Sequence, residues 1–152
     1  TIAKQPKNKL NKVKIFGTHF ASLDIRQDSR IHHSVLMDLG VLPENYSTLS
    51  ETDKIKVLGT IEGKINPADY NETITRDTIE SIYAIQTVQA LNGEAGCHRY
   101  IISNCQTAVN VMELYALIRL CGMDQHISNI DIVPLFETID DLAASDYGNL
   151  VP

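Results

Sequence analysis

The sequence has few cysteines and no long apolar run, and both shortages exclude classes of protein. Its 152 residues include only Cys97, Cys105 and Cys121, which form no CxxC pair. Neither a zinc site nor a disulfide framework is indicated, so we expect three structural thiols in a reducing cytoplasm. No apolar run approaches the roughly 20 residues that span a bilayer, and the amino-terminus lacks a signal-peptide pattern. We therefore expect a cytoplasmic protein with no membrane partner.

Positive charge is also scarce. The chain has 13 Lys and Arg against 19 Asp and Glu, a formal net charge of −6. Nucleic-acid binding relies on clustered Lys and Arg, so nucleic acid is not an expected partner. The basic cluster from Lys4 to Lys14 is expected to be a flexible, solvated terminus over residues 1–14. The sequence contains no GxGxxG or GxxxxGKS/T phosphate loop and no GxSxG elbow, which disfavours the common nucleotide-binding and hydrolase folds.

What the sequence does contain is an alternation of short strand patterns with longer helix patterns. Its 43% hydrophobic residues suffice for the core of a single domain over residues 1–152. Strands are predicted over 21–27, 99–103 and 130–136. Capping residues and periodicity predict helices over 29–39, 50–63, 77–92 and from 104 or 107 to 122, with a last one starting near Thr138.

This order is typical of parallel βαβ construction, with extra helices between the first two strands. A complete eight-stranded barrel takes about 250 residues. We therefore predict an α/β fold, a helix-rich segment of a (β/α) barrel with about three parallel strands.

The end of the first strand carries a charged pair. Asp24 and Arg26 share one face of this strand, opposite Leu23 and Ile25. The apolar face is predicted to meet the helices, which directs Asp24 and Arg26 toward the barrel interior. Active sites of parallel α/β folds lie at the carboxyl ends of the strands. An arginine there is either part of a structural ion pair or an anion clamp, because a guanidinium can donate two parallel hydrogen bonds to a carboxylate or phosphate.

Glu137 follows the third strand at the same end. Its carboxylate is a metal ligand, a general base or an ordinary helix-start carboxylate favoured by the helix dipole, and the pattern leaves these three open. The five histidines show no metal-ligand spacing and are expected to be structural.

Three stretches resemble one enzyme family. Residues 16–29, FGTHFASLDIRQDS, resemble the segment of phosphoenolpyruvate carboxylase centred on DIRQ, then Asp or Glu, then Ser. Residues 133–142, VPLFETIDDL, resemble its PLFETxDDL motif, and residues 100–103, YIIS, resemble its Y-V/I-I-S strand. The motifs occur in the family's order with familiar spacing, and the resemblance covers essentially the whole chain.

The resemblance implies a lyase that joins phosphoenolpyruvate to bicarbonate, giving oxaloacetate and phosphate, with Mg²⁺ or Mn²⁺ and no biotin. It implies that Glu137 is a ligand of the metal and that Arg26 is a catalytic, substrate-binding residue. Asp24 and Gln27, in the same DIRQ run, are further substrate-binding candidates. This chemistry is reasonable, since a hard divalent ion takes oxygen ligands and an arginine stabilises an anionic intermediate.

The sequence also departs from the family pattern. Val109 and Asn110 stand where the family has a serine and an aspartate. The later GYSDSxKD motif, with a second metal-ligand aspartate and the catalytic lysine, does not occur in these residues. Neither does the glycine-rich HGRGGxxGRGG loop or the upstream catalytic histidine. We therefore expect the chain alone to be inactive and to hold a metal only weakly, because Mg²⁺ gives up its water reluctantly.

Two alternatives stay open. A non-catalytic carboxylate-binding or assembly module derived from the same fold would keep the motifs without the chemistry. If the parent reading frame continues into the lysine and glycine-rich motifs, the chain is a segment of the enzyme; if it does not, the module is favoured. A different metal-dependent lyase on a barrel would share Glu137 but lack the DIRQ run. In either case the sheet edges of a partial barrel predict self-association into homo-oligomers.

Overall fold

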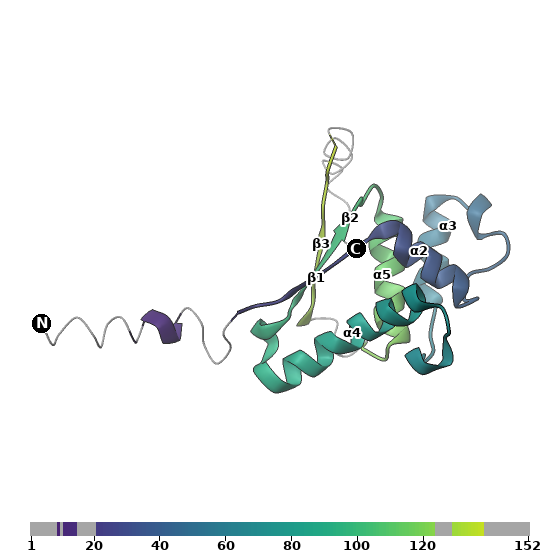
Figure 1. Ribbon diagram of the computed structural model, residues 1–152. Helices are drawn as coiled ribbons and strands as arrows, with labels where there is room; N and C mark the ends of the chain where they lie inside the picture. The colour runs from purple at the N-terminus through teal and green to yellow at the C-terminus, as the bar shows by residue number, and fades with distance from the viewer. Residues whose placement is uncertain (1–8, 10, 15–20, 124–128, 139–152) are drawn as a thin grey trace, which may run out of the picture.

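From residue 21 onward, the described part of the fold combines a small parallel sheet with four α-helices (Figure 1). The computed structural model describes residues 9, 11–14, 21–123 and 129–138. The strands are β1 (Asp24–Asp28), β2 (Arg99–Ser103) and β3 (Asp131–Pro134), in the order β1-β2-β3. The helices are α2 (Ser29–Asp38), α3 (Glu51–Thr60), α4 (Thr73–Asn92) and α5 (Ala108–Leu120), with short 3-10 turns η1 (Tyr46–Thr48), η2 (Pro67–Asp69) and η3 (Glu94–Gly96). The predicted α/β class with three parallel strands is confirmed; the sheet itself is open.

The register of the two parallel pairings determines which side chains become neighbours. Arg26 of β1 lies opposite Ile101 of β2, which lies opposite Val133 of β3. The backbone N–H of Leu135 donates to the carbonyl of Ile102 at 2.8 Å, so pairing continues just past β3. The carboxyl ends of all three strands therefore meet at one edge of the sheet.

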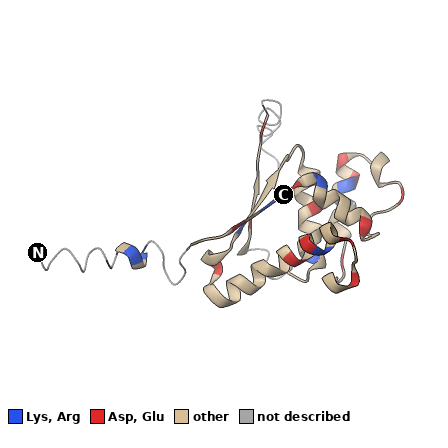
Figure 2. Cartoon of the chain, in the orientation of Figure 1, with Lys and Arg blue, Asp and Glu red and all other residues tan. Residues whose placement is uncertain are grey.

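The two faces of the sheet differ. Helices α2, α3 and α5 are grouped on one side of it (Figure 1), and Tyr100 and Ile102 of the middle strand are fully buried. The other face, which we call the open face, holds the exposed residues Asp24, Arg26 and Arg99. Charged residues of the described chain are spread over strands and helices rather than gathered on one element (Figure 2). Asp24 and Arg26 are exposed while Ile25 between them packs against the core, as the alternation predicts; that the charged face lines a barrel interior stays a prediction.

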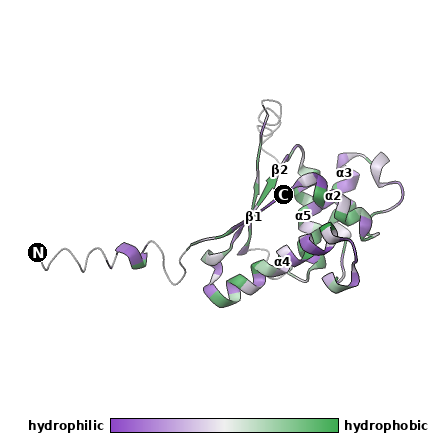
Figure 3. Ribbon diagram, in the orientation of Figure 1, coloured by the Kyte–Doolittle hydropathy of each residue, from purple (hydrophilic) through white to green (hydrophobic). Residues whose placement is uncertain are grey.

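Among the described residues, a cluster of buried apolar side chains joins the helices to the sheet. Figure 3 shows how hydrophobic and hydrophilic residues are distributed along these elements. Each of the helices α2 to α5 and the middle strand β2 contributes at least one fully buried side chain, among them Leu36, Leu58, Ile82, Tyr100 and Leu117. The three cysteines are also buried in this core, as expected of structural residues. Burial raises the pKa of Cys121 to about 12, which keeps this thiol protonated and unreactive at neutral pH.

Local capping explains why two helices begin where the sequence predicts. The Ser50 hydroxyl accepts from the Asp53 backbone N–H at 3.2 Å and donates to the Asp53 carboxylate at 2.7 Å, which starts α3. At α5 the cap is Thr107, and Asn110 Oδ1 accepts from the backbone N–H groups of Gln106 and Thr107. Asn110 thus supports the helix start where the family has an aspartate, without adding charge.

Several predicted boundaries are wrong. Strand β1 begins at Asp24 rather than residue 21, and Leu23 is 55% exposed instead of facing the helices. Helix α3 ends at Thr60, before Gly63, and α4 begins at Thr73, four residues before the predicted start. Strand β3 covers only Asp131–Pro134 of the predicted 130–136. Leu91, in the last turn of α4, is 78% exposed.

Some predictions fall on residues that the structure does not describe. Residues 16–20 of the first motif lie outside the described residues. The helix expected to start near Thr138 also lies outside them, since residues 139–152 are not described. Within residues 1–14 the described positions are helical, and the flexibility of this terminus stays a prediction. No described helix combines the length and apolar character needed to cross a membrane.

His32 is the one histidine fully buried among the described residues, and it bonds to the sheet. Its Nε2 lies 3.1 Å from the hydroxyl of Tyr100, while its Nδ1 has no hydrogen-bond partner within the described chain. Burial lowers the pKa of His32 from 6.5 to about 4, although the negative charge of Asp28 acts in the opposite direction. The unfolded chain therefore binds this proton more readily than the folded chain does.

We predict that acid destabilises the fold through His32. The free energy of unfolding should be unaffected by this residue above pH 6.5 and should fall as the pH drops toward 4, by about 3 kcal/mol in total. Urea unfolding followed by circular dichroism over this range measures the loss. His32→Gln, which keeps a polar partner for Tyr100 but cannot titrate, should remove that part of the slope, whereas His98→Gln should retain it. An unchanged slope in His32→Gln would contradict the assignment.

Candidate functional site

Arg26 and Glu137 meet at the carboxyl edge of the sheet although they lie 111 positions apart in sequence. Arg26 Nη2 donates to Glu137 Oε1 at 3.1 Å, and the two side chains are 58% and 43% exposed. The two outer strands are about 10 Å apart, twice the spacing of neighbouring strands. The long side chains therefore reach toward each other across β2. The structure brings together the two residues that the sequence ranked first.

Asp24, a substrate-binding candidate, has a different partner. Its Oδ1 accepts from Nε of Arg99 at 2.9 Å, because the register places these residues side by side on β1 and β2. Asp131 lies opposite Arg99 on the other side, on β3. This charged row is nearer the amino ends of the strands than Arg26 is. Arg99 was not among the site residues predicted from the sequence. Because side chains alternate along a strand, its position next to the buried Tyr100 could have placed it on the open face.

Gln27, the other substrate-binding candidate, lies on the opposite face from Arg26, since successive side chains of a strand alternate. Its Oε1 accepts from the backbone N–H of Asp28 at 3.0 Å, and its carbonyl accepts from the Ser103 hydroxyl at 3.3 Å. The structure therefore does not bring the Gln27 side chain to Glu137.

The connections after β1 and β2 are tied to each other beside this edge. The Ser29 hydroxyl donates to the carbonyl of Asn104 at 2.7 Å, and Asn104 takes a left-handed backbone with φ of 52°. Asp28 caps α2 and also accepts from Nε and Nη2 of Arg30, at 2.9 and 2.7 Å. Hydrogen bonding from Arg30 lowers the pKa of Asp28 to about 2. These bonds hold the segment after β1 against the segment after β2 and fix the start of α2.

The residues of this edge fit a bound divalent metal only in part. The Glu137 carboxylate offers oxygen donors, which Mg²⁺ and Mn²⁺ prefer. However, a guanidinium already contacts one of these oxygens. Across residues 21–123 and 129–138, no three His, Cys, Asp or Glu side chains lie together as a metal-binding group. The described residues therefore supply one ligand rather than a complete site.

A second polar cluster lies between α2, η1 and α5, away from the sheet edge that carries Arg26. The Glu113 carboxylate is only 3% exposed; its Oε1 lies 2.8 Å from Nδ1 of His33 and accepts from the Tyr46 hydroxyl at 3.4 Å. Burial and the negative charge of Glu113 raise the pKa of Tyr46. The cluster links α5, α2 and η1. The sequence does not reveal it, because the three residues are brought together only by helix packing.

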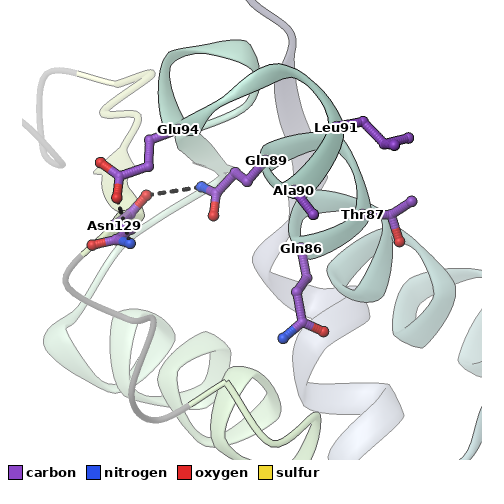
Figure 4. Close-up of a pocket in the computed structure, with 7 residues that line it drawn as sticks. All are labelled: Gln86, Thr87, Gln89, Ala90, Leu91, Glu94 and Asn129. Atoms are coloured by element: carbon purple, nitrogen blue, oxygen red, sulfur yellow. Dashed lines mark hydrogen bonds between the residues drawn. The ribbon is translucent and has the colours of Figure 1, made fainter.

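A surface pocket of about 670 Å³ lies at the other end of the sheet, beside the last turns of α4 (Figure 4). Within it Gln89 donates to the carbonyls of Cys97 and Asn129, and Asn129 donates to Glu94. These bonds fasten the helix to the segments that precede β2 and β3. No predicted site residue lines this pocket, which lies at the amino ends of the strands.

Comparison with known proteins supports the resemblance seen in the motifs. The family model of phosphoenolpyruvate carboxylase matches residues 1–147. A phosphoenolpyruvate carboxylase from Prochlorococcus marinus (strain MIT 9301) is 35% identical over 145 residues, which is 89% of this chain and 15% of the relative. The corresponding enzyme from Mycobacterium leprae is 33% identical over 142 residues, 86% of this chain and 15% of the relative.

A third relative gives the same result. The phosphoenolpyruvate carboxylase of a Synechococcus species is 31% identical over 141 residues, 86% of this chain and 13% of the relative. The chain thus spans a small part of the length of the curated relatives it matches. Because the family model matches nearly its whole length, this chain belongs to the phosphoenolpyruvate carboxylase family.

Proposed function

We propose that the chain is a segment of the catalytic barrel of a cytoplasmic phosphoenolpyruvate carboxylase, which carboxylates phosphoenolpyruvate with bicarbonate to give oxaloacetate and phosphate. The observation that carries this proposal is the 3.1 Å contact of Arg26 with Glu137. The two residues belong to two of the three motifs that resemble the family, and they lie at the edge where parallel α/β folds hold their active sites.

In this proposal each residue of the pair has one role. Glu137 would be one ligand of Mg²⁺ or Mn²⁺, and the ion would supply Lewis-acid stabilisation of negative charge on the substrate oxygens. The Arg26 guanidinium holds the anionic substrate by hydrogen bonds from its planar donors. Asp24 acts less directly, because it is bonded to Arg99 one row away from the site.

The remaining strands of the barrel would complete this arrangement. Within the described residues, β1 and β3 each pair with one neighbouring strand only. Further strands paired at these two edges would close the sheet and enclose the charged side chains of the open face. Closing the sheet in this way would surround Arg26 and Glu137 with the additional ligands that a tightly held ion needs.

We predict that the 152-residue chain alone forms no oxaloacetate, since its two site residues neutralise each other and supply one metal ligand. The measurement is a coupled assay for oxaloacetate with phosphoenolpyruvate, bicarbonate and Mn²⁺, with a complete phosphoenolpyruvate carboxylase as the positive control. Oxaloacetate formation that disappears in Glu137→Gln would contradict the prediction of inactivity while supporting the assigned site.

The alternative function, an assembly module that kept the fold without the chemistry, is favoured by one observation. The sheet has two outer strands with unpaired edges among the described residues. Such edges are ready to pair with another chain. A carboxylate-binding version of this module is less well supported, because Arg26 and Arg99 both already contact carboxylates.

We predict that the isolated chain self-associates through this sheet into dimers or larger homo-oligomers. Light scattering after size-exclusion chromatography measures the mass. Val133→Lys, which adds a charge to the open face of the outer strand β3, should shift the population toward monomer. Ala84→Lys, on an exposed position of α4, adds the same charge away from the sheet and should have no effect. A strictly monomeric wild-type chain would rule out this association.

A further inference from the structure

We propose that a pocket between the amino ends of α2, α3 and α5 binds a small oxyanion that carries one proton, hydrogenphosphate or bicarbonate. The pocket has a volume of about 410 Å³, and neither Arg26 nor Glu137 lines it. A histidine held by a buried carboxylate, two cationic side chains and three helix starts surround it. The inference depends neither on a metal nor on the proposed carboxylase activity.

Three helices begin at this pocket. Its lining includes Ser29 at the start of α2, Glu51 at the start of α3 and Thr107, the cap residue of α5. The amino end of a helix carries a partial positive charge, and anions bind favourably there. The combined field of three such ends favours a negatively charged ligand, and the side chains of the pocket decide which one.

Two cationic side chains can hold the negative charge. Lys54 lies over the ring of Tyr46, with Nζ 5.5 Å from the ring centroid, and this contact leaves the N–H donors of the ammonium group for a ligand. Arg30 donates to Asp28 through Nε and Nη2, which leaves Nη1 as a donor. Glu51 is an exposed carboxylate in the lining and limits the affinity for an anion.

A buried carboxylate orients the histidine of the pocket. Glu113 is 3% exposed, its Oε1 lies 2.8 Å from Nδ1 of His33, and its buried Oε2 has no hydrogen-bond partner within the described chain. An ionised carboxylate only accepts, so Nδ1 donates to it and Nε2 of the neutral imidazole is an acceptor. The two ring nitrogens point in nearly opposite directions, so Nε2 faces away from Glu113. Because His33 is 47% exposed, a ligand in the pocket can reach it.

One kind of ligand satisfies both sets of groups. Nε2 of His33 needs a hydrogen-bond donor, whereas Lys54 and Arg30 need acceptors. Hydrogenphosphate and bicarbonate each combine one O–H with negatively charged oxygens, and both keep the proton at neutral pH. Sulfate and acetate lack that O–H, and so does most methyl phosphate, whose second pKa is about 6. The pocket should therefore prefer the protonated oxyanions.

The test is a titration of the 152-residue chain with phosphate at neutral pH and constant ionic strength, followed by the amide NMR signals of the residues that line the pocket. Methyl phosphate and sulfate, which lose one hydrogen bond, should bind about two- to ten-fold more weakly than phosphate. His33→Phe, which keeps a ring beside Tyr46, should lower the affinity for phosphate to that for sulfate. Bicarbonate against acetate repeats the comparison, and the protonated ion that binds more tightly identifies the ligand.

Lys54→Gln tests the cationic contact and should weaken phosphate binding by about two- to ten-fold. Lys56→Gln is the matched control, because it makes the same change on α3 at a residue that does not line the pocket, and it should leave the affinity unchanged. Amide spectra of each variant establish that the fold is retained.

Several results would overturn the proposal. Equal affinities for phosphate, methyl phosphate and sulfate in the wild-type chain would remove the role of His33, and this comparison needs no variant. Absence of shifts at the pocket with both phosphate and bicarbonate would remove the site, as would equal losses in Lys54→Gln and Lys56→Gln. A nitrogen NMR spectrum with the ring proton of neutral His33 on Nε2 in the free chain would contradict its orientation by Glu113.

Discussion

The in-register parallel pairing of three short strands is the constraint on which the rest of this structure depends. Parallel neighbours cannot be joined by tight turns, so each connection has to return along the sheet through helices. Helices α2, α3 and α4 make the first return and α5 makes the second. The same pairing aligns the carboxyl ends of the strands. It thereby brings Arg26 and Glu137 within 3.1 Å across 111 positions of sequence.

Stability and chemistry reside on different faces of this sheet. The helix-covered face holds the apolar core, in which Tyr100 and Ile102 are fully buried. The open face holds exposed ion pairs, and pairs of that kind contribute about 0–1 kcal/mol each. They therefore add little to the stability of the fold. Their effect is to pair each guanidinium with one carboxylate: Arg26 with Glu137 and Arg99 with Asp24.

The sequence predicted what depends on local patterns and on strand ends. The starts of α3 and α5 carry capping residues, and Arg26 and Glu137 follow from their positions at the ends of alternating strands. The start of α4 was missed because its cap, Glu72, makes no side-chain hydrogen bond. The pairing of Asp24 with Arg99 and the burial of Glu113 against His33 depend on register and helix packing. No local pattern encodes such contacts between distant segments.

The strands are parallel and paired so that Arg26, Ile101 and Val133 form one row, with Glu137 reaching Arg26 from beyond it. Nuclear Overhauser effects between neighbouring strands test this arrangement most directly. We expect parallel cross-strand contacts between Arg26 and Ile101 and between Ile101 and Val133, together with contacts between the Arg26 and Glu137 side chains. An antiparallel pattern, or a register shifted by even one residue, would contradict it, because either would carry Arg26 away from Glu137.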